Sequence, residues 1–364
     1  MMETQYTITP GTETDRCEWN DFVLNHPQGH RMQTSYWAQT KALSGWDIHY
    51  LLARQNGQLV GGAQLYERHL PLVGAIICLP KGPLCADGAA GLLPELESQA
   101  RQWAKANHKL CLLVQPAAQG EQLVQHLLAE KYAKLPDENI VSPATIIIDL
   151  QPDQDTLFKN MSKAKHKNIH RAQESKIEVK IGASQEDLDR FYNLYLNTSC
   201  YLKFEPSSKE RFKNIWNCLS PEGHILFFTS YFEDQPLSSI MALCFGDSVI
   251  CHRFGWSKDH SEKRPNDLLH WQAMLWAKEN GYRYFDFGEI ELDAARKLCE
   301  DGAIPEEYQH TSVSFKLNFG GKPMLYPETY IYFTNPLLRW CYRTFGEQLI
   351  DLPPVQKMLS AVSG

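Results

Sequence analysis

Hydrophobic and polar positions change from a helical to a strand-like period within one segment, NDLLHWQAMLWAKENGYRYFDFGEI (residues 266–290). In its first half, apolar residues recur every three or four positions, which places Leu268, Trp271 and Leu275 on one face of a predicted helix. A proline precedes this run and Gly281 follows it, where a helix is expected to begin and end. The alternating aromatic residues of YRYFDFG then predict a strand.

The first half of the chain repeats this order of elements. LLARQNGQLVGGAQLY and GAIICLPKGPL predict three strands, and LPELESQARQWAKANHKLCLLV predicts a helix and a fourth strand. In the second half, ILFFTSYFEDQPLSSIMAL and SVICHRFGWS precede the helix and strand described above. Trp103 and Trp276 are 173 residues apart, and so are Lys105 and Lys278. A repeat of this length indicates two similar domains rather than a solenoid, whose periods are much shorter.

A hairpin, a third strand, a helix and a fourth strand form the core order of the GNAT-like acyltransferase fold. We therefore expect a mixed α/β protein with two tandem GNAT-like domains. The expected domains cover residues 1–143 and 144–322, and residues 323–364 form a C-terminal tail. A chain of 364 residues suits two domains better than one.

Composition and charge restrict where such a protein works. The net charge of −7 means that any site for a polyanion must be a local basic patch. The ten cysteines form no CxxC pair and no Cys/His metal spacing, which favours reduced thiols in a cytoplasmic protein without metal or cofactor. The polar N-terminal stretch is unlike a signal peptide, and the longest apolar run, LPLVGAIICLP, is too short to cross a bilayer.

Five motifs, in this order, resemble those of the Fem family of aminoacyltransferases (the FemA, FemB and FemX types). They are QTSYWAQTK (33–41), LPKGPL (79–84), KHKNIHRA (165–172), the segment 266–290 and VSFKLNFGG (313–321). The resemblance covers most of the chain and implies two GNAT-like domains with a tail that returns to the first. It implies transfer of an amino acid from aminoacyl-tRNA to an amine of a peptidoglycan (cell-envelope) precursor. A peripheral contact of the protein with the membrane is expected as well.

Three positions depart from the family pattern. Glu289 stands where the family has a glycine, Glu205 replaces an arginine that contacts precursor phosphate in FemX-like members, and Phe254 replaces a tyrosine. The reversed charge at Glu205 argues against the usual UDP-linked precursor. Two alternatives therefore stay open. One is an N-acyltransferase, with acyl-CoA as a donor, that acts on an amino sugar of a surface polysaccharide or on a small metabolite; the other is a non-catalytic GNAT-like binding protein.

Lys316 is the first candidate catalytic residue. It lies between Phe315 and Phe319 in a strand-like run, and it occupies the lysine of the family's FKxxF motif. The resemblance implies that it binds donor phosphate or stabilises negative charge on the reacting carbonyl. The alternative is a surface lysine whose aliphatic stem covers the aromatic rings.

Three carboxylates at the end of the predicted strand are candidate acceptors of the amine's proton: Asp286, Glu289 and Glu291. Asp286 alternates with two phenylalanines, so its alternative is a hydrogen-bonded structural carboxylate. Five residues in or beside the family motifs are candidate substrate contacts: Trp37, Lys41, Lys81, Arg253 and Phe254. For the two lysines the alternative is an ordinary surface position.

A basic stripe is predicted on one helix. Lys159, Lys163, Lys167 and Arg171 are each four residues apart, which places them on one face, and Lys165, His166 and His170 are expected to extend the positive surface. Such a stripe suits the phosphates of tRNA or of a nucleotide-linked acceptor. The alternative is a solvated helix face.

The turns before the two helices bear on the donor. CoA-dependent GNAT enzymes hold pyrophosphate in a glycine-rich turn whose backbone N–H groups face the anion. The equivalent turn in the second domain, SKDHSEKRPND, has no glycine, and that in the first, CADGAAGLLPE, has no basic residue. Neither suits pyrophosphate, which favours aminoacyl-tRNA over acyl-CoA.

Overall fold

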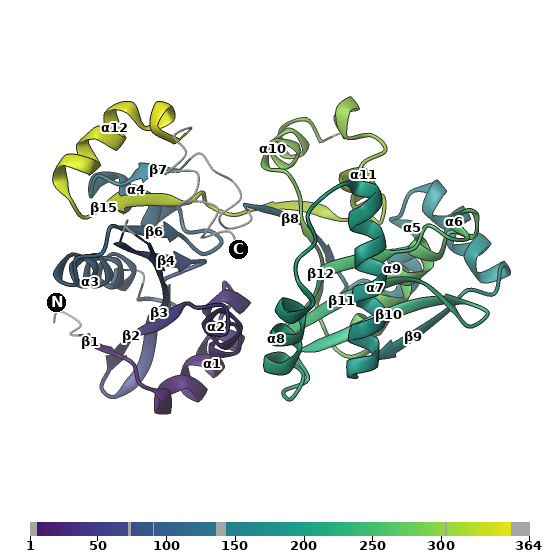
Figure 1. The fold of residues 1–364 in the computed structure, drawn as a ribbon, viewed down its shortest axis with the longest axis horizontal. Coiled ribbons are helices and arrows are strands. Elements are labelled where there is room, and N and C mark those ends of the chain that lie inside the picture. Colours follow the sequence, from purple (N-terminus) through teal and green to yellow (C-terminus); the bar gives the residue numbers. More distant parts are fainter. Residues whose placement is uncertain (1–5, 72–73, 90, 136–142, 303, 351–364) are drawn as a thin grey trace. The chain divides into compact units, whose positions relative to one another are not determined.

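The computed structural model describes residues 6–71, 74–89, 91–135, 143–302 and 304–350. The chain divides into two compact units (Figure 1). Unit 1 comprises Met1–Pro143 and Tyr326–Gly364, and unit 2 comprises Ala144–Leu325. The first five residues of the N-terminal stretch weighed as a signal peptide lie outside the described residues.

Unit 1 is built on one mixed sheet with the strand order β1-β2-β3-β4-β6-β15-β7, and β5 pairs with β3 at the side. Its strands are β1 (Thr7–Pro10), β2 (Asp47–Gln55), β3 (Gln58–Leu70), β4 (Gly74–Pro80), β5 (Leu84–Cys85), β6 (Cys111–Gln115), β7 (Ala133–Lys134) and β15 (Tyr330–Phe333). Its helices are α1 (Arg16–Asn25), α2 (Ser35–Ala42), α3 (Leu92–Ala106), α4 (Glu121–Ala129) and α12 (Pro336–Ile350), with the short 3₁₀ turns η1 (Glu13–Asp15) and η2 (Arg31–Gln33). β15 follows unit 2 in the sequence and pairs with β6, so the end of the chain completes the first sheet.

Unit 2 has a sheet of order β14-β8-β13-β12-β11-β10-β9. Its strands are β8 (Ala144–Asp149), β9 (Glu178–Gly182), β10 (Ile225–Phe232), β11 (Gln235–Phe245), β12 (Ser248–Trp256), β13 (Tyr284–Glu289) and β14 (Lys322–Leu325). Its helices are α5 (Gln154–Lys159), α6 (Lys163–Glu174), α7 (Gln185–Leu202), α8 (Lys209–Leu219), α9 (Pro265–Glu279), α10 (Leu292–Asp301) and α11 (Ser312–Leu317), with η3 (Ser261–Lys263) and η4 (Glu306–Tyr308).

The predicted duplication is present in the fold. A hairpin, a third strand, a helix and a parallel fourth strand recur as β2-β3-β4-α3-β6 in unit 1 and as β10-β11-β12-α9-β13 in unit 2. α9 begins at Pro265 and ends before Gly281, whose φ of +83° suits the residue after a helix. The mixed α/β class with two GNAT-like sheets is confirmed.

Each sheet buries an apolar face under its central helix. In unit 1, Leu96 and Ala100 of α3 pack in one core with Leu65 of β3 and Leu112 of β6. In unit 2, the larger core gathers α9 residues with those of β10 to β13. None of the helices within the described ranges is long and apolar enough to span a bilayer.

Two sequence expectations about elements are wrong. The segment VSFKLNFGG does not form a strand: residues Ser312–Leu317 make the short helix α11. Thr311 caps this helix, because its hydroxyl accepts the N–H of Val313. Lys159 does not share a helix with Lys163, since α5 ends at Lys159 and α6 begins at Lys163.

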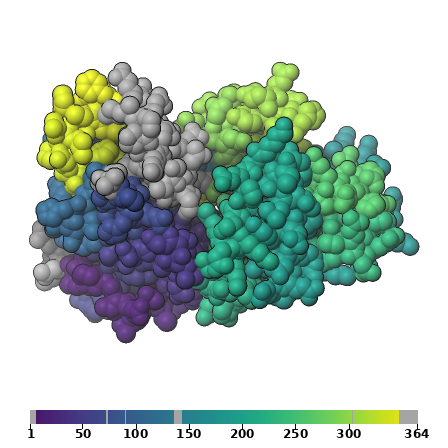
Figure 2. All heavy atoms as spheres, viewed as in Figure 1, coloured from purple at the N-terminus to yellow at the C-terminus, as the bar shows by residue number. Residues whose placement is uncertain are grey.

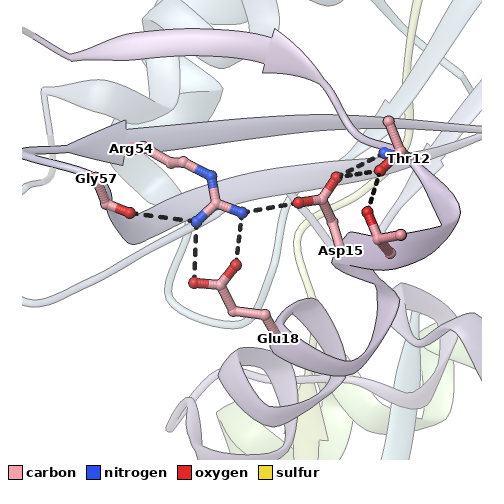
Figure 3. A network of polar contacts seen from close by, with 6 residues as sticks. Thr12, Asp15, Glu18, Arg54 and Gly57 are labelled. Carbon is pink, nitrogen blue, oxygen red and sulfur yellow. Dashed lines mark hydrogen bonds and ion pairs between the residues drawn. The ribbon is translucent and has the colours of Figure 1, made fainter.

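A polar network fastens the N-terminal elements of unit 1 to its first hairpin (Figure 3). Arg54 of β2 forms ion pairs with Asp15 at 2.9 Å and Glu18 at 2.5 Å, and it donates to the carbonyl of Gly57 at 3.4 Å. Thr12 contributes its N–H and its hydroxyl to Asp15. These groups are partly exposed, so each pair contributes little to stability by itself.

Candidate functional site

The parallel pair at the centre of unit 2 separates before either strand ends. β12 and β13 are paired only from Ser248 opposite Tyr284 to Ile250 opposite Asp286. Beyond that point β12 has a bulge against β11, and β13 shifts its register against β8 between Asp286 and Glu289. The two strands thus stop pairing before their carboxyl ends, and we call the region beyond the last pair the unit 2 gap.

Gly288 makes this geometry possible. Its φ is +77°, and a Cβ atom there would lie 2.7 Å from the carbonyl oxygen of Cys251 on β12. The side chain of Asp286 holds the turn, because its Oδ1 accepts the Gly288 N–H at 2.7 Å and the hydroxyl of Thr145. Asp286 is buried and makes both hydrogen bonds, so it fits the alternative of a hydrogen-bonded structural carboxylate.

Lys316 reaches the unit 2 gap from α11. Its Nζ donates to the carbonyl oxygen of Glu289 at 2.6 Å and of Gly288 at 3.3 Å. An ammonium has three N–H donors, and these two bonds fix its position. Burial lowers the pKa of Lys316, while the negative charges of Asp286, Glu289 and Glu291 act against that shift. The structure thus places a half-buried cation, rather than a fully solvated one, at the end of β13.

Two arginines bring further positive charge to the same end of unit 2. Burial, followed by the positive charge of Arg253, lowers the pKa of Arg211, and the charge of Glu289 acts in the opposite direction. Arg253 lies on β12 and donates to the carbonyl of His252 at 2.8 Å. Arg211 lies in the first turn of α8 and was missed in the sequence, because KERFK on an amphipathic helix looks like a solvated face. Only the fold brings it near Arg253.

An aromatic group surrounds a neutral histidine between α9 and α11. The His270 ring lies within 6 Å of four phenylalanine rings: Phe254, Phe287, Phe315 and Phe319. Burial lowers the pKa of His270 to about 3, so the ring is neutral. Its Nδ1 lies 2.7 Å from the carbonyl oxygen of Asn266, which can only accept, so Nδ1 carries the proton and donates it. Phe254, a candidate substrate contact, therefore packs in this group from β12. In the sequence, His270 is recognisable only as a position within the predicted helix.

Lys165 was expected to extend the surface stripe, and this expectation is wrong. It is 4% exposed, and its Nζ forms an ion pair with Asp267 at 2.6 Å. The same ammonium lies 3.3 Å from the ring centre of Phe315 and 4.2 Å from that of Phe319. Burial lowers the pKa of Lys165 to about 8. The pair joins α6 to the first turn of α9 beneath the helix that carries Lys316.

The remaining basic residues of α6 do form an exposed stripe. Lys163, Lys167 and Arg171 are exposed on one helix, without Lys159. His166 is half-buried, and its ring stacks on Phe158 at 4.5 Å. The stripe is therefore narrower than the sequence suggested, with three cations in three turns.

The candidate contacts of unit 1 lie in two joined motifs. Gln33 donates to the carbonyl of Pro80 at 2.6 Å, which ties QTSYWAQTK to LPKGPL. Lys81 is 2% exposed, so the surface position considered for it is wrong; its Nζ lies 3.2 Å from the ring centre of Tyr326. Lys41 is half-buried, with its Nζ 5.4 Å from the ring centre of Trp46.

Trp37 is buried, 5.3 Å from the guanidinium of Arg31. Both units thus hold residues named from the sequence. Lys316, Asp286, Glu289, Glu291, Arg253 and Phe254 belong to unit 2, and Trp37, Lys41 and Lys81 belong to unit 1.

One group of side chains has the composition of a metal site. Asp47, Glu67 and His69 offer ligand atoms that all lie within 4.8 Å of one another. Lys109, however, donates to Glu67 at 2.5 Å, and His49 bonds the other oxygen of this carboxylate at 2.9 Å. An ammonium therefore neutralises the central carboxylate, and the group is an ion-pair network in this structure.

Sequence comparisons agree with this architecture. Residues 14–134 match the model of the FemAB family, and residues 159–301 match that of an acetyltransferase (GNAT) domain. A lipid II:glycine glycyltransferase of Staphylococcus epidermidis is 25% identical over 226 residues, which is 59% of this chain and 54% of the relative. The enzyme of the same name from Staphylococcus aureus is 24% identical over 221 residues, 58% of this chain and 52% of the relative.

These matches support a relation of the chain to the Fem family. The chain spans about half the length of the curated relatives it matches. The crystal structure of FemX has a TM-score of 0.78 and 18% identity, over 92% of this chain and 99% of that one. A tandem GNAT protein from the clavulanic acid biosynthesis pathway has a TM-score of 0.55 and 10% identity, over 91% of this chain and 99% of that chain. These two structures support the fold.

Proposed function

We propose that this protein transfers an amino acid from aminoacyl-tRNA to an amine of a cell-envelope precursor and forms an amide. The observation that carries the proposal is the half-buried ammonium of Lys316 in the unit 2 gap. The matching relatives are named lipid II:glycine glycyltransferases, which supports a peptidoglycan precursor as the acceptor. The reaction is expected in the cytoplasm, where charged tRNA is found.

The chemistry requires a positive charge, a proton acceptor and an oriented amine. A neutral amine attacks the ester carbon, a tetrahedral oxyanion forms, and collapse releases the 3′-hydroxyl of tRNA as the amide forms. We place Lys316 next to the oxyanion or a donor phosphate, where a positive charge in a partly dry site stabilises the transition state. The exposed carboxylate of Glu289 is the proposed first acceptor of the amine's proton, since the carboxylate of Asp286 is occupied by Gly288 and Thr145.

Two features support a polyanionic donor. Lys163, Lys167 and Arg171 form an exposed stripe on α6, and Arg211 with Arg253 adds positive charge beside Glu289. Glu205 stands where FemX-like members have an arginine, and we propose that Arg211 provides the positive charge that is missing at that position. We assign the stripe to the backbone of tRNA and leave Trp37, Lys41, Lys81, Arg253 and Phe254 as the proposed contacts of the acceptor and of the aminoacyl group.

Acyl-CoA is the second candidate donor, because residues 159–301 match a GNAT acetyltransferase domain. The acceptor would then be an amino sugar of a surface polysaccharide or a small metabolite. The start of α9 works against this reading. The pyrophosphate of CoA would need exposed backbone N–H groups in the first helical turn, but Pro265 has no N–H and Asp267 is 5% exposed. A GNAT-like protein that binds but does not react is a third reading.

One assay separates these readings. The protein is incubated with charged total tRNA and with UDP-linked or lipid-linked peptidoglycan precursors, and products are detected by their mass shift. We expect a precursor carrying one added amino acid, and ribonuclease treatment of the donor should abolish it. Efficient turnover with acetyl-CoA but not with charged tRNA would refute the donor. Binding of precursor without any product from either donor would favour the non-catalytic reading.

A further inference from the structure

Helix α12 is held on unit 1 by its polar side. Arg339 donates to the carbonyl of Phe333 at 3.0 Å, and its guanidinium lies 4.3 Å from the ring centre of Tyr332. The buried ring of Tyr342 lies 5.1 Å from Phe333. The side chain of Asn335 caps the helix by accepting an N–H of the first turn at 2.8 Å. These contacts fix the rotation of the helix about its axis.

The opposite side of α12 is apolar and faces outward. Its large side chains are exposed to unusual extents: Leu337 66%, Leu338 43%, Trp340 59% and Phe345 46%. A surface helix normally shows the reverse arrangement, with its apolar side against the core. Figure 2 shows α12 (yellow) at the surface of unit 1. We call these four residues the α12 apolar face. The helix is kinked at Phe345, whose ring lies 6.2 Å from that of Trp340. Exposed apolar surface of this kind marks an interaction site.

Positive charge adjoins the α12 apolar face. Between Pro336 and Gly346 the helix carries two arginines and no carboxylate, in a chain whose net charge is −7. Arg343 is exposed on this helix. An apolar side with Trp, Phe and Leu beside Arg is the pattern of helices that lie in a membrane interface.

We propose that α12 docks on an anionic lipid bilayer, with its axis in the plane of the membrane. Leu337, Leu338, Trp340 and Phe345 enter the boundary between head groups and acyl chains, while Arg343 contacts lipid phosphates. A second copy of this chain fits less well, because a two-fold contact would bring the same cations together. α12 belongs to unit 1 and the unit 2 gap to unit 2, so this inference and the proposed transfer reaction can fail independently.

Vesicle binding tests the proposal. The full-length chain is sedimented with vesicles of phosphatidylcholine alone and with vesicles that contain one quarter phosphatidylglycerol. We expect binding to the anionic vesicles, and a Leu337→Ser/Trp340→Ser variant should bind at least about tenfold more weakly, because two buried apolar side chains are lost. Arg343→Gln should weaken binding to anionic vesicles roughly fivefold. The matched control is Leu43→Ser/Leu128→Ser, which removes two exposed leucines (59% and 47%) from other parts of unit 1.

A second measurement places the helix directly. Bromine-labelled lipids should quench part of the tryptophan fluorescence of the parent, and Trp340→Phe should remove that part while the protein still binds. Circular dichroism and the melting temperature verify that each variant is folded. No binding to either vesicle, or equal loss in the control variant, would overturn the proposal. So would a parent dimer that Leu337→Ser/Trp340→Ser converts to a monomer without any vesicle binding, since the partner would then be a second copy.

Discussion

The parallel strand pairs of the two units differ at their carboxyl ends. In unit 1, β4 and β6 are paired from Ile76 opposite Cys111 to Pro80 opposite Gln115, and the N–H of Gly82 bonds the carbonyl of Gln115 beyond the last pair. In unit 2, the pairing of β12 and β13 stops after three positions. The central pair of unit 1 is thus paired to its end, whereas that of unit 2 stops short of the region where Lys316 binds the carbonyls of Gly288 and Glu289.

The central helices show the same contrast. Glu97 of α3 and His270 of α9 are related by the offset that relates Trp103 to Trp276. Glu97 is fully buried and bonds the side chains of Arg101, His126 and Tyr132, so it belongs to a closed polar network. His270 instead lies among phenylalanine rings. At this position unit 1 therefore has a residue that joins its helices by hydrogen bonds, whereas unit 2 has a residue that packs among aromatic rings near the unit 2 gap.

The largest effect is expected from the buried ion pair beneath α11. Lys165→Met leaves the Asp267 carboxylate buried without its partner, so the free energy of unfolding should fall by about 3–5 kcal/mol. Urea denaturation measures this loss. The exposed pair Lys209–Asp189 provides the control, and Lys209→Met should cost less than about 1 kcal/mol. Equal small losses of unfolding free energy in both variants would show that the buried pair does not stabilise unit 2.

The Lys316→Met variant tests whether the charge of Lys316 in unit 2 is needed for transfer. Removing one charge that stabilises the transition state costs about 3 kcal/mol, so transfer should slow about a hundredfold while the melting temperature stays near the parent value. The neighbouring exposed Lys322 of β14 is the control, and Lys322→Met should transfer at the parental rate. Lys81→Met, in unit 1, should instead lower the melting temperature, because Lys81 is buried against Tyr326. Parental activity of Lys316→Met would place the chemistry elsewhere.

Gly288→Ala should close or distort the unit 2 gap. Its new Cβ meets the carbonyl of Cys251 at 2.7 Å in addition to the strain of a positive φ, so we expect a loss of about 2 kcal/mol in stability and a large loss of transfer. Gly281→Ala shares the positive φ but has no atom within 4 Å of the added Cβ. It should therefore cost only about 1 kcal/mol and keep its activity. If the two variants behave alike, the close approach at Gly288 is unimportant.

The pH profile should reveal the cation in the gap. Burial lowers the pKa of Lys316 below its ordinary value of 10.5, so its positive charge is lost as the pH rises through this lowered value. The rate kcat/KM should accordingly fall on the alkaline side before an ordinary lysine titrates. Lys316→Arg should be slower but should lack this alkaline limb, because guanidinium stays charged. An unchanged limb in that variant would assign it to another group.

The smallest effect is expected from the α6 stripe. Replacing Lys163, Lys167 and Arg171 by Gln should weaken tRNA binding at low salt and flatten its salt dependence, because fewer counterions are released. Stability should change little, since these side chains are exposed. Filter binding across a salt series measures both the affinity and the slope. An unaltered slope would reduce the stripe to a solvated helix face.

Periodicity alone determined the core elements. The helix over α9, the strand over β13 and the matching series in the first half were predicted because each buries one face, and burial leaves a period of 3.6 or 2 in the sequence. The charge on α6 was likewise visible from its spacing. Short elements were harder: VSFKLNFGG has alternating apolar residues, yet Thr311 caps it as the one-and-a-half-turn helix α11. A segment of six residues has too few periods to distinguish the two.

The sequence by itself thus determined the fold class, the duplication, the family motifs and Lys316 as a candidate. Only the tertiary structure decided that Lys165 is buried on Asp267, that Arg211 approaches Arg253, and that the α12 apolar face points outward. The reason is physical. Periodicity records which face of an element avoids water, but a charged side chain is buried or exposed according to a partner that can lie about a hundred residues away, as Asp267 lies from Lys165.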